Sequence, residues 1–415
     1  MAGQPADDSL RQLFLDIAQR LYNGDDPSDD PTLLRQTAAQ LLEGVEKGFG
    51  HALPDLEFGT PDYDTLEELA RNVYHFSAAK NYHELHDLSL ALRDGDRLRS
   101  FDEFMHLADE ITGKYNLNWL RSEYNQAVAA AQCAARWNEY SSRKDIMPYL
   151  QYTAVMDGNT REEHAALNGV VKRMDDPFWD KYYPPNGWGC RCEAVQLPGS
   201  YYRETPDTEI QYPAVPKMFL ANFGKSRMVF PQGHPYYKRL PKEQEHLLQE
   251  KSRAEVRRIL DNAEQYRTLK ANPMYKDVDF DWKIGGLKAT HKDHNFDKVG
   301  GQYELEAQRA EFKDGNKVIF GSEKGGVIGQ KYIEGLWNDH SFEIGSSLGT
   351  GKNNIKGILN HCKDKEAEVA VIYFPKPELY SFERLKNGIK RYNGQTDHRF
   401  KEIIYIVDGK VKSYK

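Results

Sequence analysis

Apolar residues near the start of the chain recur every three or four positions. Leu10, Phe14, Ile17 and Leu21 share this spacing, and the same period returns over residues 34–45. Side chains with this spacing fall on one face of a helix. The acidic stretch DDPSDDP between the two segments predicts a loop, because proline interrupts helices. We therefore expect two amphipathic helices separated by a loop.

The helical period continues in pieces to about Tyr140. A periodic segment begins at Asp64 and ends at the turn RDGD, and the alanine-rich segment NWLRSEYNQAVAAAQCAARWNEY predicts a helix packed closely on its neighbours. Cys133 lies inside this helix, and we interpret it as a small buried apolar residue. Farther along, residues 241–273 carry many charges of both signs and no glycine, which predicts a solvated helical linker.

The pattern changes beyond Pro273, where short apolar runs alternate with helical periods. The expected helices cover residues 302–312 and 353–361, and the expected strands lie in KDGNKVIF, HSFEI, residues 368–374 and the two arms of KEIIYIVDGKVKSY. The valine-rich run 368–374 predicts a central strand, and Asp408 with the glycine after it predicts a hairpin turn. We expect a small α+β domain with a mostly antiparallel sheet and helices on one side.

These patterns divide the 415 residues into several domains, as the length also suggests. We expect a mainly α-helical module over residues 1–240, the helical linker over 241–273 and the α+β domain over 274–415. The last part holds 24 Lys and Arg against 21 Asp and Glu, whereas the first 273 residues hold 32 against 42. The two ends of the chain are therefore expected to meet different partners.

Composition argues against two classes of protein. No apolar stretch approaches the roughly 20 residues that cross a bilayer, and the start MAGQPADDSL lacks the basic and apolar regions of a signal peptide. Four cysteines are too few for a disulfide framework in a chain of this length. We expect a protein made in the cytoplasm, with no membrane span, whose thiols are reduced or bind a metal.

The middle of the chain departs from the helical pattern. A helix is predicted over Thr160–Val171, with Asn159 or Thr160 as its cap, and it carries His164. The run PPNGWG then predicts an irregular loop, which leads directly into the sequence CRC.

Four residues of this region have the chemistry of a zinc site. Cys190 and Cys192 can supply two thiolates, His164 an imidazole and Asp157 a carboxylate, which together would complete a tetrahedral structural Zn²⁺ site. The alternative is that both cysteines are reduced and packed, and that the histidine caps or hydrogen-bonds the loop.

The order of these elements resembles the phage Mu F-type head morphogenesis family of minor capsid proteins. The motif D-x-x-T-R-x-x-H, from Asp157 to His164, is followed by DDPFW, by YPPxGxxCRC and by VFPQGHPYYKRL. The resemblance covers roughly residues 1–240. It implies a few copies in each virion near the portal, a role in head assembly or DNA delivery, portal and capsid proteins as partners, and a frequent C-terminal fusion to a toxin domain.

The stretch GGLKATHKDHNFD places two histidines close to a lysine. Cleavage of RNA by its own 2′-hydroxyl needs a base, an acid and a cation near the phosphate. His291 and His294 titrate near neutrality and could supply base and acid, while Lys288 could stabilise the phosphate. We predict a ribonuclease that needs no metal. The alternative is that a histidine only hydrogen-bonds the loop.

The C-terminal part also resembles a known group. The segments GGLKATHKDHNFDKVGGQYELEAQ, EGLWNDHSFEI, NNIKGILNHC, AEVAVIYFP and FKEIIYIVDGKV are similar to the tRNase domains of contact-dependent inhibition toxins, in the barnase/EndoU/colicin/RelE group. The resemblance implies a metal-independent endoribonuclease that cleaves tRNA, carried here by Lys288, His291 and His294. Thr396 and His398 are further candidates near the closing strands. A cognate immunity protein is a possible partner.

Two other functions remain open for the C-terminal domain. A metal-dependent nuclease would need clustered carboxylates, and Glu334, Asp339 and Glu343 lie around the FEI strand. Alternatively, the domain could be structural and bind DNA or the portal. We expect a virion-borne effector, present in the capsid interior and in the bacterial cytoplasm after synthesis or delivery, whose C-terminal domain is a ribonuclease.

Overall fold

The computed structural model describes residues 8–24, 31–200, 202–298, 300–324 and 333–414. The chain divides into two compact units, residues 1–256 and 257–415. The long helix α10, Lys242–Ala271, contains the division, so the segment predicted as a helical linker is helical. The predicted domain boundaries at residues 240 and 273 remain predictions.

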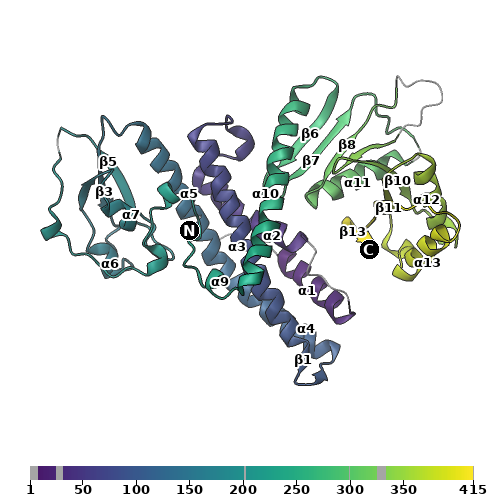
Figure 1. Cartoon of the computed structure of the whole chain (residues 1–415), viewed down its shortest axis with the longest axis horizontal. Coiled ribbons are helices and arrows are strands. Elements are labelled where there is room, and N and C mark those ends of the chain that lie inside the picture. Colours follow the sequence, from purple (N-terminus) through teal and green to yellow (C-terminus); the bar gives the residue numbers. More distant parts are fainter. Residues whose placement is uncertain (1–7, 25–30, 201, 299, 325–332, 415) are drawn as a thin grey trace. The chain divides into compact units, whose positions relative to one another are not determined.

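Helices make up about half of the first unit (Figure 1). Besides α10, its helices are α1 (Asp8–Tyr22), α2 (Thr32–Phe49), α3 (Pro61–Ala91), α4 (Phe101–Thr112), α5 (Leu120–Ser142), α6 (Glu162–Ala165), α7 (Phe178–Tyr182), α8 (Phe223–Ser226) and α9 (Pro235–Lys238). Short 3₁₀ turns cover Leu53–Asp55, Asp207–Glu209 and Lys217–Phe219, and a π-helical segment, Gly113–Trp119, joins α4 to α5. Leu10, Phe14 and Ile17 are buried, so the amphipathic pattern of the first helix is confirmed.

Helices α2 and α5 approach each other closely because α2 carries two glycines at the contact. A Cβ atom at Gly48 would lie 2.1 Å from the carbonyl oxygen of Val128, and one at Gly44 would lie 2.9 Å from that of Tyr124. Any larger residue would push the helices apart. Cys133 of α5 is buried, as predicted, and its thiol pKa is raised to about 12 by burial.

A buried polar cluster lies between α3 and α5. The Lys80 ammonium is fully buried and donates to Glu123 at 2.5 Å and to the Tyr115 carbonyl at 2.8 Å. Glu84, one helical turn along α3, accepts a hydrogen bond from Asn116. Burial raises the pKa of Glu84 to about 7. A buried ammonium needs such partners because removing a charge from water is costly.

A small antiparallel sheet corrects the mainly helical prediction for this unit. Its strands, in the spatial order β4-β3-β5, are Val171–Arg173, Tyr149–Thr153 and Glu193–Leu197. The helix predicted over 160–171 is much shorter, because the backbone from Gly169 onwards pairs with Tyr152 of β3. Arg161 precedes this helix, and no side chain caps it. A two-stranded hairpin, β1 (Arg93–Asp94) with β2 (Arg97–Leu98), forms the predicted RDGD turn.

The second unit is built on one eight-stranded sheet in the order β13-β12-β11-β10-β9-β8-β7-β6. The strands are β6 (Tyr275–Asp281), β7 (Gly286–His291), β8 (Lys317–Phe320), β9 (Gly335–Trp337), β10 (His340–Ser346), β11 (Val369–Phe374), β12 (Glu402–Val407) and β13 (Lys410–Tyr414). The helices are α11 (Gly301–Lys313), α12 (Asn354–Asp364) and α13 (Phe382–Asn393), and a 3₁₀ turn covers Pro377–Leu379. Strands β6 and β7, β9 and helix α13 were not predicted.

The sheet is mixed, so the predicted mostly antiparallel sheet is wrong. Strand pairs β7–β8, β10–β11 and β11–β12 are parallel, and the other four pairs are antiparallel. Each parallel pair is connected through one of the three helices α11, α12 and α13. Parallel neighbours require such crossovers. Because α13 was not predicted, the crossover from β11 to β12 was not predicted either.

Helices cover both faces of this sheet, not one as expected. Ala307 and Ala310 of α11 pack against Val318 and Val371 on one face. On the other face, α12 and α13 lie side by side and pack against residues such as Ile372 (Figure 1). Strand β11 is buried at every position and is central, as predicted. The predicted hairpin of β12 and β13 is also present.

Candidate functional site

Two cysteines and a histidine come together in the first unit. His164 lies on α6, and Cys190 and Cys192 lie just before β5. Nδ1 of His164 is 3.6 Å from Sγ of Cys190 and 3.5 Å from Sγ of Cys192. His164 and Cys192 are buried and Cys190 is half-buried. The structure therefore brings together three of the four predicted zinc ligands.

The loop before β5 is held by its backbone. The N–H of Cys190 donates to the Gly187 carbonyl at 3.0 Å, which closes a turn. Gly189 within the turn has φ +67°, a conformation that favours glycine. Arg161, at the start of α6, donates to the Trp188 carbonyl at 2.6 Å and so fixes the loop against the helix of His164.

Asp157, the fourth predicted ligand, is held elsewhere. Its two carboxylate oxygens accept hydrogen bonds from Arg191 at 2.6 and 2.7 Å, and one accepts from the Thr160 hydroxyl at 3.2 Å. The bond to Arg191 is the main reason that the pKa of Asp157 is held below its usual range. Asp157 is not part of the group formed by the histidine and the two thiols.

The two thiols share a proton unequally. The pKa of Cys190 is lowered to about 4, chiefly because its sulfur accepts a hydrogen bond from Cys192. The same bond, with burial, raises the pKa of Cys192. Tyr152 of β3 lies beside them and donates to the side-chain oxygen of Asn186 at 3.0 Å. One thiolate and a neutral imidazole are the forms that bind soft metal ions.

In the second unit, Lys288 and His291 lie on opposite faces of strand β7. They are three residues apart, and side chains alternate along a strand. Lys288 pairs in register with Val318, lies over the Phe312 ring and is 3.5 Å from Asp279. The ring of His291 accepts a hydrogen bond from the N–H of Asp293 at 3.1 Å instead. The structure does not bring these two predicted catalytic residues together.

His294, the other predicted histidine, lies among carboxylates. Its Nε2 is 3.3 Å from Glu304 and 3.6 Å from Glu334, and its Nδ1 is 3.8 Å from Glu323. The side chain is fully buried and stacks on Phe320. Burial alone would lower the pKa of His294, but the bond to Glu304 and the charges of the other two carboxylates raise it.

A fourth carboxylate, Glu343, adjoins this group and completes what we call the His294 cluster: His294, Glu304, Glu323, Glu334 and Glu343. Glu343 accepts the backbone N–H of Glu334 at 3.2 Å and lies 2.9 Å from the His361 ring. Burial, more than repulsion between neighbouring carboxylates, raises the pKa values of Glu334 and Glu343 to about 7. Such groups can give or take a proton at neutral pH.

The predicted carboxylate triad is divided by the structure. Glu334 and Glu343 meet, but Asp339 forms an ion pair at 2.7 Å with Lys317. Glu304 and Glu323 were not predicted as site residues. A signal for Glu304 existed, since it lies three and four residues before Ala307 and Gln308, which are both buried. Glutamate on the buried stripe of a helix suggests a polar site.

Thr396 and His398 lie in the segment between α13 and β12. The ring of His398 is 2.8 Å from the Tyr392 hydroxyl, and its backbone N–H donates to the Thr396 hydroxyl at 3.2 Å. His398 also packs against Phe400. These contacts fix the turn into β12, and neither residue is a member of the His294 cluster.

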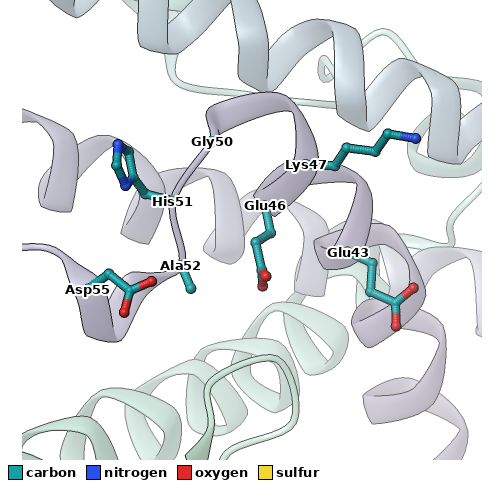
Figure 2. A pocket seen from close by; sticks show the side chains of 7 residues that line it. All are labelled: Glu43, Glu46, Lys47, Gly50, His51, Ala52 and Asp55. Atoms are coloured by element: carbon teal, nitrogen blue, oxygen red, sulfur yellow. The ribbon is translucent and has the colours of Figure 1, made fainter.

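A shallow hollow in the first unit lies at the end of α2 (Figure 2). It is lined by Glu43, Glu46, Lys47, Gly50, His51, Ala52 and Asp55. The side chains of Lys47 and His51 point away from each other, so the titratable groups do not converge on one point (Figure 2). None of these residues belongs to the metal-ligating groups found among the described residues.

The middle of the chain is similar to phage proteins. Residues 85–195 match the family model described as Phage Mu protein F like protein. A stretch of 85 residues is 45% identical to the Putative capsid assembly protein F of Escherichia phage Mu and covers 20% of this chain and 19% of that protein. A stretch of 78 residues is 48% identical to the Mu-like prophage FluMu F protein of Haemophilus influenzae, covering 19% of each protein.

These matches span about a fifth of the length of either relative. No solved structure matches the chain. Within the described residues, no helix is both long and apolar enough to cross a membrane. The similarity of the C-terminal part to the tRNase domains of toxins remains a prediction. The similarity of the first part to the phage Mu F-type family is confirmed over residues 85–195, where the family model matches. Residues 85–195, which include His164, Cys190 and Cys192, are the region that is similar to Phage Mu protein F like proteins, and we call this region the Phage Mu F-like domain.

Proposed function

We propose that this protein takes part in the assembly of a phage head. The observation that carries the proposal is the 45% identity of 85 residues to a protein named as a putative capsid assembly protein. Its partners would be portal and capsid proteins, and its place the interior of the virion after synthesis in a bacterial cytoplasm.

Removal of the gene from a phage or prophage that carries it tests this role. We expect fewer complete heads in the lysate, and we expect the full-length chain supplied from a plasmid to restore them. Electron microscopy and sedimentation of the heads give the count. Unchanged numbers of complete, DNA-filled heads without the protein would contradict the proposal.

We further propose that the second unit is an endoribonuclease that acts on tRNA. The His294 cluster supports this activity, because it holds carboxylic acids with pKa values near 7 next to an imidazole. Glu334 is partly exposed, so it can reach a bound RNA, whereas fully buried His294 would position it. An immunity protein that covers the cluster would protect the producing cell.

The proposed reaction is transesterification at a phosphodiester, with no metal as cofactor. Deprotonated Glu334 takes the proton of a ribose 2′-hydroxyl, and the 2′-oxygen bonds to phosphorus as the bond to the 5′-oxygen breaks. A proton delivered to the leaving 5′-oxygen completes the step and leaves a 2′,3′-cyclic phosphate. Glu304, also partly exposed, contacts the same Nε2 atom of His294 as Glu334, so His294, whose pKa is raised, can pass a proton through Glu304 to the leaving oxygen.

Incubation of the full chain with total bacterial tRNA in EDTA tests this activity. We expect discrete products with cyclic phosphate ends, and their loss in Glu334→Gln. His291→Ala serves as the control, because His291 is not a member of the His294 cluster. Cleavage lost in His291→Ala but kept in Glu334→Gln would return the site to the histidine predicted from the sequence.

Products that appear only with Mg²⁺ would overturn the metal-free mechanism. They would indicate that His294, Glu304 and Glu334, whose ligand atoms lie within 4.8 Å of one another, hold a divalent cation. Intact RNA under both conditions would contradict the ribonuclease and leave a structural role, such as binding to DNA or the portal.

A further inference from the structure

The histidine and the two cysteines of the Phage Mu F-like domain are placed around one point. The two sulfur atoms lie at nearly equal distances, 3.6 and 3.5 Å, from the same ring nitrogen of His164. A neutral imidazole nitrogen has one lone pair in the plane of the ring. Whether it accepts with that lone pair or donates an N–H, the nitrogen forms one good hydrogen bond along that direction, so hydrogen bonds to two equidistant sulfur atoms do not account for the arrangement.

A tetrahedral zinc ion accounts for both distances. Bonds of about 2.3 Å to sulfur and about 2.0 to 2.1 Å to nitrogen, at a tetrahedral angle, separate sulfur from nitrogen by roughly 3.6 Å. Two thiolates and an imidazole are also a soft ligand set, which favours Zn²⁺ over Mg²⁺ or Ca²⁺. Both the spacing of the atoms and their chemistry therefore fit the same ion.

We propose that His164, Cys190 and Cys192 bind one Zn²⁺, with a water molecule as the fourth ligand. Asp157 is not the fourth ligand, in contrast to the sequence-based prediction, because both of its oxygens are held by Arg191. Binding displaces the remaining thiol protons into solvent.

The ion stabilises a part of the domain that has little regular structure. Between α6 and β5 the chain forms only a three-residue strand and one short helix, and the rest is turns and loops. Zinc would connect the α6 segment directly to the loop before β5, because His164 and Cys190 are 26 positions apart in the sequence. A cross-link that closes such a loop reduces the freedom of the unfolded chain.

Zinc content of the full-length protein, purified under reducing conditions without chelator, tests the proposal. We expect one zinc per chain by plasma mass spectrometry. Substitution of the metal by Co²⁺ should give the thiolate-to-cobalt charge-transfer band of a site with sulfur ligands, which a protein without thiolate ligation does not show.

Four variants locate the site. Cys190→Ser and His164→Ala should lose the zinc, whereas Cys133→Ser, at a buried cysteine outside the group, should keep it. Asp157→Asn should also keep it. If Asp157→Asn also lost its zinc, as Cys190→Ser and His164→Ala should, the fourth ligand would be the Asp157 carboxylate and not water. That result would overturn the three-residue site.

The wild-type protein decides the question if a variant fails to fold. Reduced, folded protein that contains no zinc, takes up none when it is added, and gives no cobalt charge-transfer band would overturn the proposal. A disulfide between Cys190 and Cys192 in protein purified without reductant, with no metal after its reduction, would do the same. Neither result depends on head assembly or on ribonuclease activity.

Discussion

At the scale of single residues, the interior of the second unit contains a carboxyl group that is hydrogen-bonded through only one of its two oxygens. Glu311 of α11 is 2% exposed. Its Oε2 accepts hydrogen bonds from Trp337 at 2.9 Å and from Asn316 at 2.7 Å, while Oε1 has no hydrogen-bond partner among the described residues. Burial raises its pKa to about 8, so the side chain is largely neutral in the folded protein at pH 7.

This pKa predicts that the second unit is less stable in alkali. The folded pKa is above the unfolded value of 4.5, so the folded state binds more protons between these values. The contribution of Glu311 is full below about pH 4.5 and is lost as the pH rises to about 8. Glu311→Gln, which keeps an oxygen for both donors, should remove this loss.

Urea unfolding at pH 5 and pH 8 measures the effect. We expect the variant to gain stability relative to the wild type on going from pH 5 to pH 8, by up to roughly 4 kcal/mol. Glu84 in the first unit is unchanged in both proteins and cancels in the comparison. An equal pH dependence in both proteins would show that Glu311 does not hold its proton in the folded state.

Only one of the two groups of candidate site residues could be predicted from the sequence. His164, Cys190 and Cys192 could be grouped because turn residues and the C-x-C spacing bring them together locally. The carboxylates around His294 could not, because Glu304 and Glu334 come from different elements that only the sheet and α11 place side by side. The opposite orientations of Lys288 and His291 could have been predicted only if both residues had been assigned to one strand.

At the scale of elements, glycines set how closely the helices lie on the sheet. Gly345 of β10 faces α12, and a Cβ atom there would lie 2.3 Å from Cγ2 of Ile358. Gly357 lies on the exposed side of the same helix, and a Cβ atom there would meet nothing within 4 Å. A side chain at Gly345 would therefore clash with α12, whereas a side chain at Gly357 would point into open space.

Alanine at these two positions should therefore have opposite effects. Gly345→Ala should destabilise the second unit by roughly 1 to 3 kcal/mol, because α12 must move away from the sheet. Gly357→Ala should stabilise it by about 0.5 to 1 kcal/mol, because glycine is a poor helix former. Urea midpoints of the unit measure both changes. A neutral Gly345→Ala would mean that α12 does not pack on β10 this tightly.

Element prediction succeeded where the pattern was long or fully apolar. The helical period of α1 and the all-buried strand β11 are clear signals. Strand β6 carries charges at several positions and has three exposed residues, so its sequence lacks the apolar alternation of a strand. The length of the helix expected over 160–171 was overestimated, because helix propensity carries no information about the pairing of Gly169 with β3.

At the scale of the whole molecule, the chain joins two units of different chemistry. The first carries the Phage Mu F-like domain with its thiol and imidazole group, and the second carries a mixed sheet with the His294 cluster. The α+β character of the second unit could be predicted from alternating strands and helices. Its strand order and parallel pairs could not, because they depend on crossovers that span many residues.

We propose that this protein is a component of the phage head, and its presence in purified heads is the sharpest test of that proposal. Heads from the phage that encodes the chain would be purified on a density gradient and analysed by quantitative mass spectrometry. We predict peptides from both units, at a few copies per head and in a constant ratio to the portal protein. Heads that contain portal and capsid proteins but no peptide of this chain, at any stage of assembly, would show that the protein is not a component of the head.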